Sequence, residues 1–212
     1  MLSVSLIERT LEARDYDRLL RDLADNGMEI PLSLRLRLCQ CPAAPVALAL
    51  RRLVELTYGP TRLSRELVER LLLSQSPEGG FAADCGHDRD PLVAAAVLAG
   101  LGRVAADHVS AANDDLFDSL DRGYAALAEL QDCDGLFSSP SDRSLADRAM
   151  TSAFILSLLG SEPRFRDAVR LSELFRWFEA QEGRLDRHTQ HLWDLASITS
   201  SHVEVEPLVF AA

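Results

Sequence analysis

Hydrophobic residues recur along most of this chain with the period of an α-helix. Leu63, Leu67 and Leu71 are spaced at i, i+4 and i+8, and apolar residues repeat in a similar way over 120–130 and 171–178. This spacing gathers the apolar side chains on one face of a helix. Alternation with a period of two, which is typical of strands, is confined to two short pieces, 33–38 and 203–206. The first piece is equally compatible with a helix. The pattern therefore predicts an all-α protein.

A motif of the form Q-x-x-x-G-x-F occurs twice. It begins at Gln75 and again at Gln131, 56 residues later. Each copy follows an amphipathic segment and leads through a polar loop into an aspartate and a run of small and apolar residues. A degenerate third copy begins at Gln181 and has a shorter loop. Repetition at a fixed period is typical of helical-repeat architectures.

The runs that follow the motif, at 90–98 and 147–156, are apolar nearly all round, and 45–50 resembles them. A helix of this kind must be covered on every side, so we expect these runs to be inner helices of a shared core. Asp90 and Asp147 stand where helix N-caps are expected, and Pro91 is suited to a first helical position.

The repeats predict four helical hairpins with one or two further helices before them. We expect a single domain spanning 1–212, with an N-terminal helical extension at 1–29, hairpin repeats at 30–200 and a tail at 201–212. The predicted hairpins span about 30–57, 61–106, 112–160 and 166–200, with boundaries uncertain by a few residues.

Charge and composition exclude several classes of function. The 33 acidic residues exceed the 22 basic residues, which gives a net charge of −11. Such a surface repels phosphate backbones and anionic lipids, so we expect neither nucleic acid nor a membrane as partner. Every basic residue is an arginine. Chemistry that needs a Schiff-base or P-loop lysine is therefore excluded.

The start of the chain has no basic segment, and its apolar stretch ends at Glu8. This pattern does not fit a signal peptide or a membrane span. We therefore expect a cytoplasmic protein whose cysteines, Cys39, Cys41, Cys85 and Cys133, are reduced thiols.

An outer helix that ends in Q-x-x-x-G-x-F, then a loop, an aspartate and an alanine-rich inner helix, resembles the α/α toroid of terpenoid cyclases and protein prenyltransferases. The resemblance covers roughly residues 61–200. It implies that the motif residues tie adjacent hairpins together and are structural rather than catalytic. These residues are Gln75, Gly79, Phe81, Gln131, Gly135 and Phe137.

The catalytic motifs of that superfamily match poorly. Its class II cyclases use the central acid of D-x-D-D, whereas Asp88 and Asp90 are followed here by Pro91. Arg89 between the two carboxylates favours their ionised forms, which opposes general-acid chemistry. The inner-helix positions that carry the zinc ligands of the prenyltransferases hold apolar residues in this chain. About four hairpins, rather than the six of a closed toroid, predict an open arc or an incomplete ring.

Four aspartates, Asp88, Asp90, Asp147 and Asp186, recur at the same end of successive inner helices. Together they could bind a cation or a magnesium–diphosphate complex. Helix capping is the favoured explanation, because it accounts for each aspartate without the others.

Two weaker candidate sites involve metals. The four cysteines together with His87 could form a zinc site, although no C-x-x-C pair is present. His188 and His191 could share a metal, although a solvated helix face is the better interpretation.

Trp193, with Phe154 and Trp177, could line an apolar cavity for an isoprenoid-like chain. Core packing is the more common role of an aromatic residue at helical spacing.

Two functional hypotheses follow. The favoured one is a non-catalytic helical module that binds a partner protein, a second copy of itself or an apolar ligand, without a cofactor. The alternative is a reduced-size isoprenoid-processing enzyme, prenyltransferase-like or terpene-cyclase-like, in which Asp88 and Asp90 act as acids or as Mg²⁺ ligands. A third hypothesis is that this chain is one subunit of a hetero-oligomer, in which another subunit supplies the missing hairpins.

Overall fold

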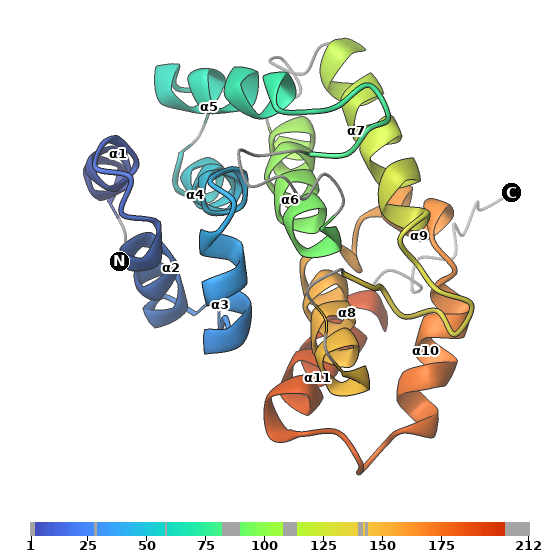
Figure 1. Ribbon diagram of the computed structural model, residues 1–212. Coiled ribbons are helices and arrows are strands. Elements are labelled where there is room, and N and C mark those ends of the chain that lie inside the picture. The colour runs from blue at the N-terminus through green and yellow to red at the C-terminus, as the bar shows by residue number, and fades with distance from the viewer. Residues whose placement is uncertain are drawn as a thin grey trace, which may run out of the picture.

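The computed structural model describes residues 3–27, 29–57, 59–81, 90–107, 114–139, 142 and 144–201, with side chains described as far as 198. These residues form an all-α fold, as the hydrophobic pattern predicts (Figure 1). The helices are α1 (Val4–Glu12), α2 (Tyr16–Asp25), α3 (Leu32–Cys39), α4 (Ala43–Leu56), α5 (Arg62–Leu73), α6 (Pro91–Asp107), α7 (Asp114–Ala128), α8 (Leu145–Leu159), α9 (Pro163–Ala168), α10 (Leu171–Ala180) and α11 (Arg187–Ser201).

The segment 33–38, which the sequence left open between strand and helix, lies within α3. Each predicted hairpin interval contains two helices, and the short α9 is an addition that the pattern did not predict. The other strand-like piece, 203–206, lies outside the described residues. None of the helices described is long and apolar enough to span a membrane.

The four helices that the sequence predicts to be inner, α4, α6, α8 and α11, pack in that order, each against the next. Helix α6 is buried from Pro91 to Gly102, which matches its apolar surface. A Cβ atom at Gly100 would lie 2.5 Å from the carbonyl oxygen of Ala47, so the absence of a side chain there lets α6 lie directly against α4. Helices α4, α6 and α8 form the centre of the hydrophobic core, whereas α11 buries only the face that carries Thr189, Leu192 and Ala196.

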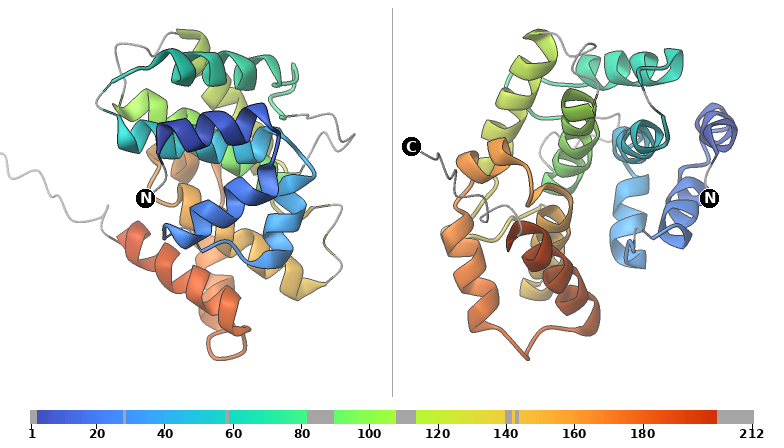
Figure 2. Two further views of the ribbon diagram at one scale, coloured as in Figure 1. Left: turned by 90° about the vertical axis from the view of Figure 1, so that its left-hand side faces the viewer. Right: turned by 180° about the vertical axis from the view of Figure 1, so that it is seen from behind.

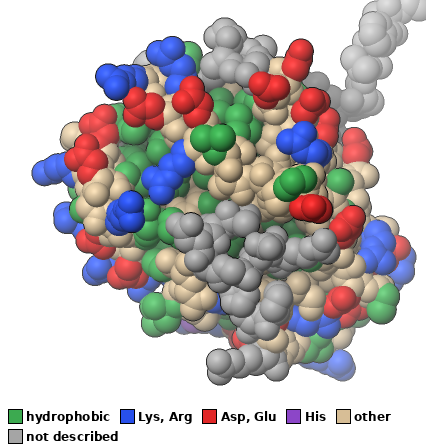
Figure 3. All heavy atoms as spheres, turned by 45° about the horizontal axis from the view of Figure 1, so that its top comes forward, with side chains coloured by type: hydrophobic (Ala, Val, Ile, Leu, Met, Phe, Trp, Pro, Cys, Tyr) green, Lys and Arg blue, Asp and Glu red, His purple; other side chains and the backbone are tan. Residues whose placement is uncertain are grey.

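The remaining helices cover this core from several sides. Helix α5 packs on α4 and α7 packs on α6, while α1, α2 and α3 all pack on α4. Opposite views show α7, α9 and α10 on one side of the inner helices and α1–α3 on the other (Figure 2). On the face that carries α5 and α7, arginine and acidic side chains are interspersed (Figure 3). This is the pattern of a solvated helix face.

The first Q-x-x-x-G-x-F motif joins α5 to α7. The Gln75 side-chain amide donates to the carbonyl oxygen of Gly79 at 3.1 Å and to that of Ser119, in α7, at 2.8 Å. Arg122 of α7 donates to the Gln75 side-chain oxygen at 3.0 Å. Gly79 has a φ of +88°, and its Cα lies against the backbone of Arg122. Gln75 and Phe81 face each other as an antiparallel bridge.

The second motif repeats this arrangement toward α10. The Gln131 amide donates to the carbonyl oxygens of Gly135 at 2.7 Å and Arg170 at 3.2 Å. The backbone N–H of Arg170 donates back to the Gln131 side chain at 2.8 Å. Gly135 has a φ of +87° and lies against the backbone of Leu174. The glutamines and glycines of both motifs therefore contact the next segment of the chain, which is the structural role expected for them.

The third, shortened copy keeps only part of the geometry. Gly183 has a φ of +74°, but a Cβ atom there would have nothing within 4 Å. Gly183 can therefore serve as a control for Gly79 and Gly135, because it shares their positive φ but not their close backbone contacts.

We expect Gly79→Ala and Gly135→Ala to lower the free energy of unfolding by about 3 kcal/mol each. The new Cβ atoms would lie 2.3 Å from the carbonyl oxygen of Arg122 and 2.5 Å from the backbone nitrogen of Leu174. Overpacking of this kind adds to the cost of a positive φ for alanine. Gly183→Ala should lower the free energy of unfolding by only about 1 kcal/mol, because alanine there has an unfavourable positive φ but no steric clash. Urea unfolding of the three variants measures the difference, and equal losses would contradict the docking role of the turns.

Candidate functional site

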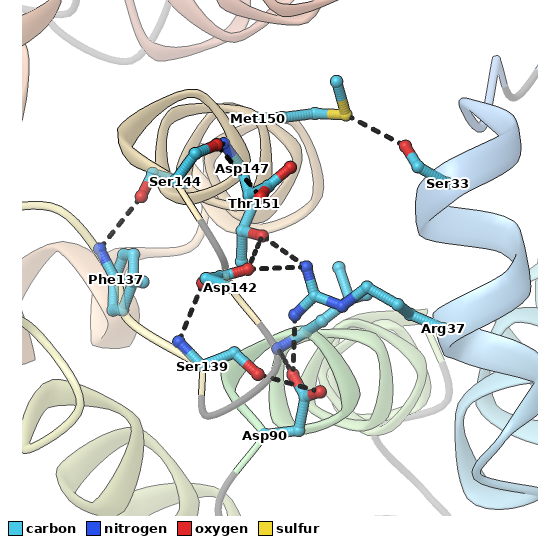
Figure 4. A network of polar contacts seen from close by, with 12 residues as sticks. Ser33, Arg37, Asp90, Phe137, Ser139, Asp142, Ser144, Asp147, Met150 and Thr151 are labelled. Carbon is cyan, nitrogen blue, oxygen red and sulfur yellow. Dashed lines mark hydrogen bonds and ion pairs between the residues drawn. The ribbon is translucent and has the colours of Figure 1, made fainter.

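A buried polar cluster lies where the first turns of α6 and α8 meet α3 (Figure 4). We call it the Arg37 cluster; its members are Arg37, Asp90, Ser139, Asp142 and Thr151. The Arg37 Nη1 atom donates to Asp142 Oδ1 and to Thr151 Oγ1, both at 2.8 Å. Its Nη2 atom lies 3.6 Å from Asp90 Oδ1. Ser139 donates its N–H to Asp142 at 2.8 Å and its hydroxyl to Asp90 at 3.2 Å.

One guanidinium therefore faces two carboxylates inside the protein. The Asp142 side chain is 1% exposed and that of Arg37 is 16% exposed. A charge at such depth is tolerated only when it is paired and hydrogen-bonded. Asp142 has these partners, because Arg37, Ser139 and Thr151 all donate to it. The cluster joins α3 to the core across more than 100 residues of sequence.

Asp90 caps α6, as the sequence predicts. Its Oδ1 atom accepts from the backbone N–H of Leu92 at 2.9 Å, and its Oδ2 atom accepts from Ser139. Both carboxylate oxygens are thus engaged within the fold. Asp88, the other member of the D-x-D pair, lies outside the described residues.

Asp147 is not the N-cap of α8, contrary to the expectation from the sequence. Ser144 is the N-cap, and its hydroxyl accepts from the Asp147 backbone N–H at 3.1 Å. The same hydroxyl donates to the Asp147 carboxylate at 3.0 Å. The spacing misled the prediction because the second polar loop is longer, and a serine three residues before the aspartate is the better cap.

Asp186 is the N-cap of α11. It accepts from the backbone N–H groups of His188 at 3.0 Å and Thr189 at 3.1 Å, and from the Thr189 hydroxyl. Partial burial is the largest single effect and raises the pKa of Asp186, but the hydrogen bonds together outweigh it. The net result is a pKa below the ordinary value for an aspartate. This carboxylate therefore serves to stabilise the helix start.

The cysteines do not form the zinc site considered from the sequence, as far as the described residues show. Cys39 ends α3, and burial and then the charge of Asp17 raise the pKa of its thiol. Cys41 is buried before α4, while Cys133 is exposed in the turn after α7. Cys85 and His87 lie outside the described residues. Within those ranges no group of three or more His, Cys, Asp or Glu side chains is arranged to hold a metal.

The aromatic candidates lie in the packing between helices. Trp193 of α11 stacks on Phe178 of α10, with ring centroids 4.6 Å apart, and meets Phe175 edge-on at 5.0 Å. Trp177 also packs edge-on against Phe178. Phe154 is almost fully buried, but it lines one of the cavities described below. His191, which was considered as a metal ligand with His188, contacts Glu29 at 2.7 Å.

The cavities that the described residues form beside these elements include the following three. The α6–α7 cavity, of about 320 Å³, is lined by Asp90 with Glu78, Phe81 and Glu129 among others. The α3–α8 cavity, of about 440 Å³, is lined by Arg37, Leu36, Gln40, Asp147 and Met150 among others. The α4–α11 cavity, of about 340 Å³, is lined by residues of α2, α4, α8 and α11.

The α3–α8 and α4–α11 cavities both lie between an N-terminal and a C-terminal part of the chain. Each has one wall from residues 23–55 and the other from residues 147–195, and we call the space between these walls the N–C cleft. The walls touch at the Arg37 cluster, where Ser33 also donates to the Met150 sulfur at 3.3 Å, and at the Glu29–His191 contact. Residues 29–37 thus contact both α8 and α11.

No family model matches this chain, and neither a curated protein nor a solved structure gives a significant match. The likeness to the terpenoid cyclase and prenyltransferase superfamily thus rests on the repeated motif alone.

Asp142 and its role were missed from the sequence. No local pattern marks it, because its cationic partner lies 105 residues away. The nearest signal is the spacing of Ser139 and Asp142, which allows a local hydrogen bond between a side chain and the backbone.

Arg37→Met removes the cationic partner of Asp142, and we expect it to lower the free energy of unfolding by about 3 kcal/mol. Arg62→Met is the matched control, because Arg62 is 90% exposed in its pair with Glu66 and its loss leaves no buried charge. Denaturant unfolding measures both. Adding Asp142→Asn to Arg37→Met should recover part of the loss. An Arg37→Met protein as stable as the control would contradict a structural role for the buried pair.

Asp186→Asn tests the pH dependence of the α11 cap. Because the folded-state pKa of Asp186 is lowered, its charge stabilises the fold above its unfolded pKa, and this contribution is lost as the pH falls through the folded pKa. Asparagine also caps helices but does not titrate. We expect the wild type to be the more stable protein at neutral pH and the difference to vanish in acid. Urea unfolding between about pH 7 and pH 3 would reveal a constant difference if the cap did not depend on the charge.

Proposed function

We propose that this chain is a non-catalytic helical binding module that receives an apolar ligand in the N–C cleft. The proposal rests on one observation: the candidate site carboxylates among the described residues are hydrogen-bonded within the fold, whereas the cleft contains cavities. The carboxylates of Asp90, Asp142 and Asp186 accept hydrogen bonds within the fold, and Asp147 is engaged with its own helix cap. The cleft, in contrast, keeps two cavities between helices that are otherwise closely packed.

The walls of the cleft suit an apolar ligand. In the α4–α11 cavity, Phe154, Leu158 and Leu192 present apolar side chains beside Leu195, which is half exposed. In the α3–α8 cavity, Leu36 is also half exposed and lies with Met150. Ligand sites in proteins are commonly clefts of a few hundred Å³ with mostly apolar walls and a few polar groups.

The isoprenoid-processing alternative has one observation in its favour. Three carboxylates, from Glu78, Asp90 and Glu129, line the α6–α7 cavity. Carboxylates can hold Mg²⁺ and a diphosphate with it. Each Asp90 oxygen, however, already accepts one hydrogen bond, from the N–H of Leu92 or from Ser139, and these bonds favour the ionised form over a proton-donating acid.

Native mass spectrometry of purified wild type and of a cleft-filling variant tests the proposal. Ser157 lines the α4–α11 cavity, so Ser157→Phe fills it, whereas Ser172→Phe adds the same ring at an exposed position of α10. We expect a co-purifying small-molecule adduct on the wild type and on Ser172→Phe, with at least a tenfold lower occupancy on Ser157→Phe.

Other results would assign other functions. A ligand-free dimer or a stoichiometric protein partner, unaffected by Ser157→Phe, would place the function on an outer surface. Turnover of a prenyl diphosphate with Mg²⁺ that is lost in Asp90→Asn at an unchanged melting temperature would establish the enzyme alternative.

A further inference from the structure

The α4–α11 cavity has two chemically different walls. One is apolar and comes from α8 and α11, through Phe154, Leu158, Leu192 and Leu195. The other comes from the last turns of α4 and carries Arg51, Arg52 and Glu55. A cavity with one apolar and one charged wall is complementary to an amphiphile, whose chain and head group need different surroundings.

The charged wall has more donors than acceptors. Glu55 is shared by two guanidinium groups: its Oε1 atom lies 3.5 Å from Arg51 Nε and its Oε2 atom accepts from Arg52 Nη1 at 2.8 Å. Arg51 Nη1 and Arg52 Nε are buried and have no hydrogen-bond partner. Five other buried arginine nitrogens of the described residues also lack a hydrogen-bond partner, so what distinguishes Arg51 and Arg52 is that two such side chains line one cavity. Small rotations of these long side chains would turn the donors toward an acceptor in the cavity.

The other charged groups around the cavity limit the charge of that acceptor. Glu29, at the rim, is exposed and engaged by His191. Helices α4 and α8 both end beside the cavity, at Leu56 and Leu159, so their carbonyl ends offset part of the guanidinium charge. The chain as a whole carries −11. The formal charges of Arg51 and Arg52 are thus cancelled by those of Glu55 and Glu29, so an acceptor here is held by hydrogen bonds from the guanidinium groups rather than by net charge. A single carboxylate suits such a site, and the several charges of a diphosphate do not.

From these observations we infer that the α4–α11 cavity binds a monocarboxylate with an apolar chain, a fatty-acid-like amphiphile. The carboxylate accepts hydrogen bonds from Arg51 and Arg52, as carboxylates do from guanidinium groups. The chain lies along the apolar wall of α8 and α11. This inference rests on the proposed function and names the ligand chemistry of the same cleft.

The test compares decanoate with decanol by isothermal titration calorimetry, below the concentrations at which either aggregates. The two probes share a chain and differ in the head group. On the wild type we expect decanoate to bind about tenfold more tightly, because hydrogen bonds to charged groups are the stronger ones. In Arg51→Gln/Arg52→Gln the preference should disappear while decanol still binds. Arg103→Gln is the control, because Arg103 pairs with Asp107 on α6 and lines none of the three cavities.

Each contrary outcome is distinct. If decanol binds the wild type as tightly as decanoate, and Ser157→Phe abolishes both, the carboxylate inference is overturned while the apolar cleft of the proposed function stands. If both probes bind Ser157→Phe as they bind the wild type, this cavity is not their site and the inference fails. A wild type that binds neither probe but carries a different adduct in native mass spectrometry overturns the inference alone. Absence of both probe binding and adduct removes the proposed function as well.

Discussion

The constraint on which the structure depends is that α6 is apolar on nearly every side and has to be covered on every side. Helices α4 and α8 flank it and α7 covers it from outside, and each of these in turn needs a further neighbour. Burial of this extent supplies most of the driving force for folding. The close approach of α4 and α6 at Gly100 adds contact between backbones that larger residues would separate. The hairpin repeat is the arrangement that satisfies all these demands within one chain.

Polar groups in this fold serve mainly to join helices that are distant in sequence. The Gln75 and Gln131 amides fasten one hairpin to the next, and the Arg37 cluster fastens the N-terminal helices to the starts of α6 and α8. Buried ionic groups of this kind add little net stability, but removal of one partner leaves the other charge buried and unpaired.

The fold class, the helical hairpins and the structural role of the glutamine motif could be predicted from the sequence, because each depends on local periodicity or on a repeated pattern. The cap of α8 could not be predicted correctly, since Ser144 and Asp147 are both plausible caps and the loop length decides between them. Nor could Asp142 be recognised, because its partner lies on α3 and sequence spacing carries no information about that contact. The cleft depends on how α2 and α3 pack across the core, which no local pattern encodes.

The glutamine turns have a consequence for how the outer helices can vary. Gln75 and Gln131 reach the carbonyl oxygens of Ser119 and Arg170, and the two glycines lie against backbone atoms of the next segment. A contact made to the main chain is indifferent to the side chain at that position. The turn therefore fixes where the next hairpin sits while specifying few of its side chains, chiefly Arg122 and Arg170, which donate back to the turn. Outer helices built on such a joint are free to diversify their exposed faces while the spacing of the inner helices stays the same.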